Sequence, residues 1–303
     1  MRRIYVLAVL LIVGVLGIAM ADNRFGLVAQ QAEGPVIETE EVRDNLFVLR
    51  GGGGNTAAFI GPSGVTLVDT KVPGWGETLL ESVAALTDLP VTTLINTHSH
   101  FDHVGGNPEL PADIQIVAHE NSATNMLDMR PVTGFGPQNM TFEGDRGMPT
   151  DTFTDRFTLG SGDARIELYY FGRAHTNGDV WVVFPALSVM HGGDVFSGKN
   201  LPIMDANNGG SALEFPATLR KAIDALAVDT IITGHSTLMT MDDLREYADF
   251  TLEFLEAMRA AKAGGQSAED AAANWQPSER FEGYTVPEAR LLANVQTLFG
   301  ELP

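Results

Sequence analysis

The sequence predicts an α+β fold in which two β-sheets pack face to face and helices cover their outer faces. Short apolar runs rich in Val, Ile, Leu and Phe alternate with Gly and Pro, which is typical of strands joined by turns. These runs come in two rounds, and each round includes a segment of helical spacing. The chain has 303 residues, of which 44% are hydrophobic, so it can bury a core of this kind.

The first round predicts an antiparallel β-meander, a helix and one more strand. Gly and Pro separate four runs, which are Val36–Thr39, Leu46–Leu49, Ala57–Ile60 and Val65–Asp69. Residues 75–88 have helical spacing, and Val91–Ile95 is the next strand. The glycine run Gly51–Gly54 is predicted to be a hairpin turn that lies over the candidate site described below. It is not a phosphate-binding loop, because the sequence G-K-[ST] of such a loop does not follow it.

The second round begins with a strand and continues through a long irregular segment. Residues 121–156 are rich in Met, Pro and Gly without a clear period, so we expect a loop or lid. Its methionines either cover an apolar substrate or belong to an ordinary surface excursion. The regular elements of this round are Ile114–Ala118, Ile166–Phe171, Val180–Phe184 and Leu187–Met190 as strands, Leu213–Ala227 as a helix, and Thr230–Thr233 as a strand.

Residues 241–303 are predicted to form a C-terminal helical extension. Thr240 and Asp243 can cap a helix that ends near Gly264. We expect two further N-caps at Ser267 and Thr285, the latter in a capping box with Glu288.

Residues 1–21 have the pattern of a secretory signal peptide. Two arginines precede an apolar run, Ile4–Ile18, and Ala19-Met20-Ala21 follows. We expect cleavage before Asp22, export to the periplasm or medium, and no stable membrane insertion of the mature chain. Residues 22–34 are then an N-terminal tether. The alternative is an uncleaved membrane anchor.

Charge and cysteine content exclude several functions. There are 19 Lys and Arg against 39 Asp and Glu, a formal charge of −20, which disfavours nucleic acid as a partner. The chain has no cysteine, so it has no disulfide, no Cys nucleophile and no Cys-ligated metal. Any metal must be held by His, Asp, Glu or backbone oxygen.

The strongest chemical signal is a cluster that directly follows the strand Val91–Ile95. Three of the seven histidines fall within six residues, in the run His98-Ser99-His100-Phe101-Asp102-His103. Alternation along an extended chain points His98 and His100 the same way. Asp102 and His103, after a turn, can face a second point nearby. Imidazole and carboxylate suit zinc and similar ions. The alternative is a surface loop of no consequence.

Three further candidate ligands occur at or just beyond the ends of predicted strands. His175, Asp194 and His235 are each flanked by small residues that allow close backbone approach. Strand ends on one edge of a sheet can bring such side chains together, so we expect them beside the cluster. His119 and His191 are expected to be core residues.

The motifs T-H-S-H-F-D-H-V-G-G, G-R-A-H-T-N-G-D, G-G-D and T-G-H resemble the metallo-β-lactamase superfamily over about residues 35–240. The resemblance implies a four-layer αββα sandwich as the catalytic domain. It implies two divalent metal ions, with zinc expected. One would be held by His98, His100 and His175, and the other by Asp102, His103 and His235. Asp194 would bridge them together with a hydroxide.

The same resemblance suggests roles for other residues. Asp102 is the candidate to orient the hydroxide and shuttle its proton. Asp69 is either a partner behind a ligand imidazole or a turn residue at a strand end. Three cations, those of Lys71, Arg173 and Lys199, could meet an anionic substrate, but we expect them to be solvated at the surface.

The ligand set also narrows the activity. An Asp at position 194, where true β-lactamases commonly have Cys or Ser, is similar to glyoxalase II and lactonases. We therefore expect an exported dinuclear zinc hydrolase that uses the bridging hydroxide to cleave a small ester, lactone, lactam or thioester. Three alternatives stay open: a true β-lactamase, a mononuclear iron sulfur dioxygenase and a non-catalytic metal-binding protein.

Overall fold

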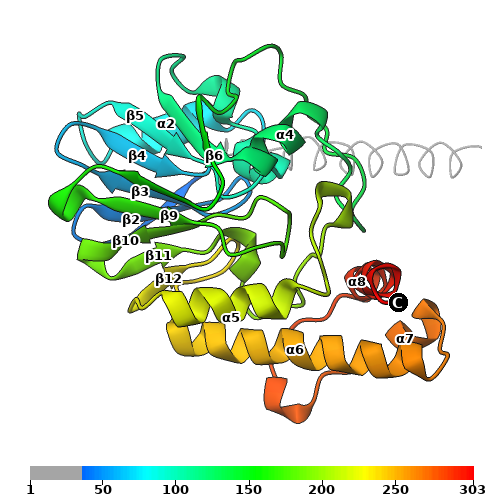
Figure 1. The fold of residues 1–303 in the computed structure, drawn as a ribbon. Coiled ribbons are helices and arrows are strands. Elements are labelled where there is room, and N and C mark those ends of the chain that lie inside the picture. Colours follow the sequence, from blue (N-terminus) through cyan, green and yellow to red (C-terminus); the bar gives the residue numbers. More distant parts are fainter. Residues whose placement is uncertain (1–35) are drawn as a thin grey trace, which may run out of the picture. The chain divides into compact units, whose positions relative to one another are not determined.

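The computed structural model describes residues 36–303, and residues 37–303 form one compact unit (Figure 1). The predicted signal peptide (1–21) and tether (22–34) lie outside the described residues. No helix within the described part of the chain is long and apolar enough to cross a membrane.

The first sheet has seven strands, whose spatial order follows the sequence from β1 to β7. Its first four strands form the predicted antiparallel meander, and β4 to β7 are parallel neighbours. Helix α2 (Gly76–Ala84) connects β4 to β5. The strands are β1 Glu38–Arg43, β2 Leu46–Arg50, β3 Thr56–Ile60, β4 Val65–Val68, β5 Val91–Ile95, β6 Gln115–His119 and β7 Asp151–Phe153.

The second sheet has five strands in the order β12-β11-β10-β9-β8. Strands β8 to β11 are antiparallel neighbours, whereas β12 joins β11 in parallel. The sequence did not predict β8, which lies at the edge of the sheet. The strands are β8 Arg156–Leu159, β9 Ile166–Tyr169, β10 Trp181–Phe184, β11 Val189–His191 and β12 Thr230–Ile232.

Alternating side chains assign each strand face to a different layer. Val48 and Val182 point into the core between the sheets. Their neighbours point outward: Leu49 packs with α2, and Val183 packs with helices of the second half. Figure 1 shows these helices, α5 (Phe215–Ala225) and α6 (Met241–Ala263), below the second sheet. The predicted αββα sandwich is confirmed.

The expectation of one long loop over residues 121–156 was wrong in part. Helix α4 (Glu120–Asp128) and strand β7 occupy its ends, which leaves residues 129–150 as the loop. Apolar periodicity could not reveal α4, because its buried face includes Ser122 and Asn125. These side chains bond to Gly178 O and Asn177 Oδ1 instead of packing in an apolar core.

The tail contains α6, α7 (Ala268–Asn274) and α8 (Glu288–Glu301). The capping box of Thr240 with Asp243 is confirmed at α6, and Ser267 caps α7. The expected cap at Thr285 was wrong, because its backbone bonds to Lys199 and Leu201 instead. Helix α8 begins after Pro287 without a side-chain cap. Its apolar residues share one core cluster with α5, α6 and the second sheet. A domain boundary at residue 240 stays a prediction.

Candidate metal centre

All seven predicted ligands come together at one edge of the sandwich. His98 and His100 follow β5, and the short helix α3 (Phe101–Val104) carries Asp102 and His103. The other three lie in the β9–β10 loop, in a 3-10 turn after β11 and just after β12, and they are His175, Asp194 and His235. Strand ends therefore converge here as the sequence predicts.

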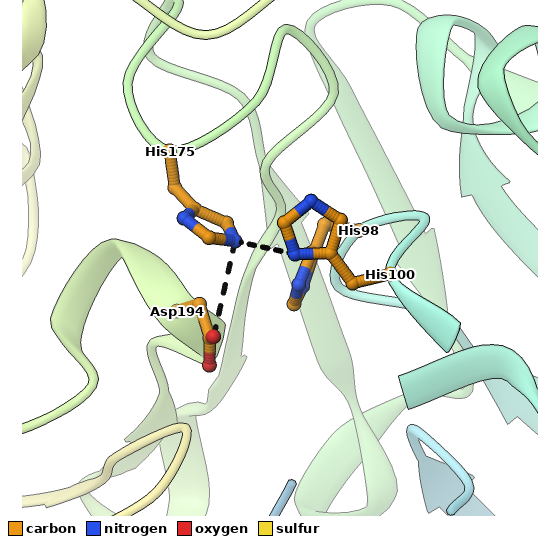
Figure 2. A group of neighbouring side chains, drawn as sticks. All are labelled: His98, His100, His175 and Asp194. Carbon is orange, nitrogen blue, oxygen red and sulfur yellow. Dashed lines mark hydrogen bonds and ion pairs between the residues drawn. The ribbon is translucent and has the colours of Figure 1, made fainter. Parts of the chain in front are cut away.

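The seven predicted ligands form two groups, and a third group, made of Asp69, His98 and His103, shares one residue with each of them. One atom each from His98, His100, His175 and Asp194 lies within 4.8 Å of the others, and Figure 2 shows these side chains converging. A second group, with the same limit of 4.8 Å, contains Asp102, His103 and His235. Asp194 adjoins both, because its Oδ2 lies 3.8 Å from His175 Nε2 and 3.1 Å from His235 Nε2.

Hydrogen bonds on the far ring nitrogens fix the tautomers in the first group. His100 Nε2 donates to Asp205 Oδ2 at 2.8 Å, and His175 Nδ1 donates to Ile203 O at 2.7 Å. A neutral imidazole has a single N–H. The two remaining nitrogens, His100 Nδ1 and His175 Nε2, therefore face each other as lone pairs at 3.0 Å. Two facing lone pairs repel each other, and a cation held by both nitrogens would relieve that repulsion.

His98 follows the same logic. The Thr97 hydroxyl donates to Asp69 Oδ2 at 2.6 Å, so His98 Nδ1 donates to Thr97 Oγ1 at 3.0 Å. Within the described residues, the buried His98 Nε2 and Asp194 Oδ1 have no hydrogen-bond partner. A buried polar atom without a partner is costly, and a divalent cation would satisfy both. The residues present fit a metal ion.

Asp69 lies behind the second group. Its Oδ2 accepts from His103 Nδ1 at 2.7 Å, and its Oδ1 accepts from Thr97 N at 2.7 Å. The residue is fully buried and has a left-handed φ of 63°. It is thus a partner that orients a ligand imidazole. The far nitrogen, His103 Nε2, faces His235 Nε2 at 3.2 Å.

The pKa shifts separate the two groups. Burial and the neighbouring imidazoles hold the pKa of His98 well below its ordinary value, and they lower that of His175 to about 4. These rings are neutral and keep their lone pairs. Burial opposes a charge on His103, but the carboxylates around it, first that of Asp194, raise its pKa. Asp194 also raises the pKa of His235. This half of the site favours positive charge.

The glycine run packs directly on the site, as predicted. Gly54 N donates to Asp102 O at 3.1 Å. A Cβ on Gly54 would lie 2.2 Å from His103 Cε1, and one on Gly53 would lie 2.6 Å from Asp102 O. Only glycine permits this approach of backbone to ligand.

Lys71 corrects a prediction. It is fully buried, not solvated, and its Nζ donates to Leu49 O at 2.7 Å and Gly54 O at 2.6 Å. Burial lowers its pKa to about 7. The other two cations are partly exposed: Lys199 pairs with Glu246, and Arg173 donates to backbone oxygens.

The two remaining histidines are buried core residues, as expected. His119 caps α4 by accepting from Asn121 N, and its Nε2 donates to Thr154 O. His191 Nε2 donates to Asn55 O, while its Nδ1 accepts from Gly193 N.

Sequence reasoning missed Asp205 and Asp179. Asp205 bonds to His100 with one oxygen and to Thr133 N with the other, which ties the 129–150 loop to the centre. Asp179 accepts from Thr176 N and Thr176 Oγ1 and so closes the turn that carries His175. Its pKa is raised to about 7 by burial. For Asp205 the signal was the nearby Asn207 and Asn208, a common turn pattern, and for Asp179 it was its place at the end of the motif G-R-A-H-T-N-G-D.

A cavity of about 430 Å³ opens beside the centre. Its lining includes Asp102, Asp194 and His235, together with apolar side chains from α3, the 129–150 loop and the 200–205 segment, which are Phe101, Val132, Phe135 and Ile203. The methionines of the loop region pack around Val104 and Phe101 instead. Of the residues in the 129–150 loop, Val132 and Phe135 line the cavity.

Comparisons with known proteins agree with this geometry. The model of the Metallo-beta-lactamase superfamily matches residues 49–235. The alpha subunit of 2,4-dinitroanisole O-demethylase from Nocardioides sp. (strain JS1661) is 30% identical over 174 residues, which are 56% of this chain and 50% of that protein. A hydroxyacylglutathione hydrolase from Trichodesmium erythraeum is 28% identical over 181 residues, 60% of this chain and 57% of that protein. The chain therefore spans about half the length of the curated relatives it matches.

Solved structures show the same fold. A metallo-β-lactamase from Pontibacter korlensis gives a TM-score of 0.61 at 17% identity, over 72% of this chain and 99% of that chain. A stereoselective inverting sec-alkylsulfatase from Pseudomonas sp. gives 0.67 at 14% identity, over 86% of this chain and 50% of that chain.

Proposed function

We propose a specific function on the premise that the chain belongs to the metallo-β-lactamase superfamily and is a hydrolase of that superfamily. The proposal is that it is an exported dinuclear zinc enzyme that cleaves a small ester, lactone, lactam or thioester. One observation carries it: two complete ligand groups lie side by side with Asp194 between them.

Two divalent ions held by these groups would supply Lewis acidity and a water of lowered pKa. Side chains of the protein position this water and accept its proton. Asp102 lines the cavity, and its Oδ2 lies 3.3 Å from His235 Nε2. Its side chain is 21% exposed, so it can reach a water in the cavity. In this proposal Asp102 orients that water and accepts its proton as attack on the substrate carbonyl begins.

The substrate class rests on cavity size and kinship. A cavity of about 430 Å³ suits a small molecule. The Trichodesmium relative is named as a hydrolase of hydroxyacylglutathione, and the Pontibacter structure as a β-lactamase. Acyl compounds such as thioesters, esters, lactones and lactams have in common the carbonyl that this site is suited to attack. Asp194 favours general hydrolysis over lactam hydrolysis as the main activity.

The complete second group and the cavity beside it each disfavour one other function. A mononuclear iron dioxygenase needs only one metal site. It would not require a second group of ligands such as Asp102, His103 and His235, which converge within 4.8 Å. A non-catalytic metal protein has no use for the cavity beside the centre. True β-lactamase activity remains the second candidate, because lactams belong to the same substrate class.

The test is metal analysis with a substrate panel. We expect about two zinc ions per chain after apoprotein is reconstituted with zinc. Turnover is then measured with nitrocefin, a lactone, a thioester and a phosphodiester. One metal per chain in excess zinc, or iron in the native protein with no turnover of the acyl substrates, would contradict the proposal.

A further inference from the structure

Arg290 of α8 lines the same cavity as the metal centre. It is about 190 residues beyond His98 and His100 in the sequence, outside the part matched by the superfamily model. The C-terminal helix thus brings a cation to a cavity whose other charged lining residues include Asp102 and Asp194.

The guanidinium of Arg290 is held but not neutralised. Its Nη1 donates to Leu201 O at 2.8 Å and to Asn200 Oδ1 at 3.0 Å. Among residues 36–303, no carboxylate forms an ion pair with it. Its Nη2 donates to no acceptor within the described chain, which leaves that N–H pair for a ligand. Arg280, by contrast, pairs with Asp249.

Asn200 adds a second donor beside Arg290. Its Oδ1 accepts from both Ser197 Oγ and Arg290 Nη1, which fixes the orientation of the amide. The amide Nδ2 then points away from both, and it has no acceptor in the part of the chain that the structure describes. Ser197, Asn200 and Arg290 all line the cavity. A guanidinium with a neighbouring amide N–H suits the two oxygens of a carboxylate.

One side of the cavity next to Arg290 is apolar. The ring of Phe135 lies 5.5 Å from its guanidinium carbon and is 57% exposed. Val132 and Ile203 complete this part of the lining. An anion bound here would therefore carry an apolar body. The chain has a formal charge of −20, which repels anions, so an anionic ligand needs a local cation.

We propose that Arg290 and Asn200 bind a carboxylate of the substrate, which makes the preferred substrates small apolar acyl compounds with a free carboxylate. The class of reaction rests on the proposed function, but the carboxylate site does not. Arg290 is then the residue that determines specificity for anionic over neutral substrates, and the C-terminal helices are part of the substrate site.

The kinetic test uses two esters that differ in one group, mono-p-nitrophenyl adipate and its neutral carboxamide analogue. In Arg290→Met we expect KM for the carboxylate ester to rise about 10- to 100-fold with kcat nearly unchanged, the loss of a charge-assisted hydrogen bond. The neutral ester should change less than about 2-fold. Arg290→Lys should recover part of the loss. Arg280→Met, which removes another arginine that stacks on an aromatic ring, is the matched control.

A binding test separates this inference from the hydrolytic function. Calorimetry of the zinc-loaded proteins compares phenylacetate with phenylacetamide, and neither is hydrolysed at an ester. The wild type should prefer phenylacetate, and Arg290→Met should lose that preference while zinc content stays close to wild type; Tm should fall somewhat, because the substitution also removes the donor to Leu201 O. Equal affinities in the wild type, no binding of either probe, or a preference that survives Arg290→Met would overturn the carboxylate site. Failure of the ester assay alone would count against the hydrolase proposal only.

Discussion

Each imidazole of the first ligand group is aimed by a partner on its far side. His98 Nδ1 donates to Thr97 Oγ1, His100 Nε2 to Asp205 Oδ2 and His175 Nδ1 to Ile203 O. These bonds determine which nitrogen of each ring has a free lone pair and can bind a cation. Asp194 adjoins both groups through the nitrogens that face the centre, whereas Asp69 bonds to His103 from behind.

Replacing Asp194 tests this arrangement. Asp194→Ala removes the shared negative charge, and we expect the second group to lose its metal first, because it keeps only two imidazoles and Asp102. Turnover should fall about 100-fold or more. Metal content and kcat are measured together, with His119→Ala as the control, since His119 bonds to Thr154 O and not to the centre. Two metals and normal kcat in Asp194→Ala would show that the site is assigned wrongly.

Lys71 makes stability depend on pH. Its pKa is lowered by burial to about 7, while the unfolded chain retains the ordinary value. Between pH 7 and about 10.5 the unfolded state therefore binds more protons, so stability should rise with pH by up to about 1.4 kcal/mol per unit. Lys71→Met should remove this rise in urea unfolding curves. Lys199→Met, at an exposed ion pair, should retain it. An unchanged slope in Lys71→Met would mean that the buried amine stays charged.

For individual residues, the sequence predicted the site best where residue type and spacing were both informative. The run from His98 to His103 and three strand ends predicted all seven converging residues. The roles of Lys71 and Asp205 were not predicted, because they depend on backbone oxygens and side chains that only folding brings close. A lysine between Thr70 and Val72 and an acid in a turn have an ordinary surface pattern.

At the scale of elements, the β2–β3 hairpin acts as a wall of the metal centre. Gly54 is held between Asp102 O, to which its N–H donates, and Lys71 Nζ, which donates to its carbonyl. The hairpin therefore packs against α3 through backbone alone, and the buried lysine fixes its position.

Gly54→Ala should disrupt this contact. The added Cβ would meet His103 Cε1 at 2.2 Å, and His103 is fully buried, so either the ring or the hairpin must move. We expect weaker binding of the second metal and a fall in kcat of about 10-fold or more. Gly300→Ala, in α8 where an added Cβ meets nothing within 4 Å, is the control. Normal zinc affinity in Gly54→Ala would mean that the hairpin yields without moving the ligand.

The helices and strands agree with the prediction wherever apolar residues recur with a regular period. The meander, β5 and α5 lie within a few residues of their predicted bounds. Helix α4 was not predicted, because two of its three buried residues are polar: Ser122 and Asn125 bond to the turn before β10. Strand β8 was not predicted, because it lies at a sheet edge and none of its four residues is fully buried.

At the scale of the whole molecule, the export prediction concerns residues outside the described part of the chain. The arginines, the apolar run and Ala19-Met20-Ala21 predict a mature N-terminus at Asp22. N-terminal sequencing or intact mass of protein from the native host checks this. Material that begins at Met1 would contradict cleavage and favour the retained anchor.

Hydrogen bonds also link the candidate metal centre to the C-terminal helix. Asn294 of α8 is buried, its Nδ2 donates to Pro202 O at 2.8 Å, and its Oδ1 accepts from Met204 N at 3.2 Å. The segment that it holds includes Ile203 and Asp205, which fix the far nitrogens of His175 and His100. Sequence periodicity predicted a helix here but could not predict this link, because it depends on packing between distant segments.

Asn294→Ala tests whether α8 supports the metal centre. It leaves Pro202 O and Met204 N without their partner, which should lower stability by about 1–3 kcal/mol. Because the loosened segment orients two ligands of the first group, zinc affinity there should fall about 10-fold while the second group changes less. Competition with a chelator measures both affinities, and Gln296→Ala, at an exposed position on the same helix, is the control. If Tm falls and both zinc affinities stay at wild-type values, α8 contributes to the core alone and the metal centre is organised without it.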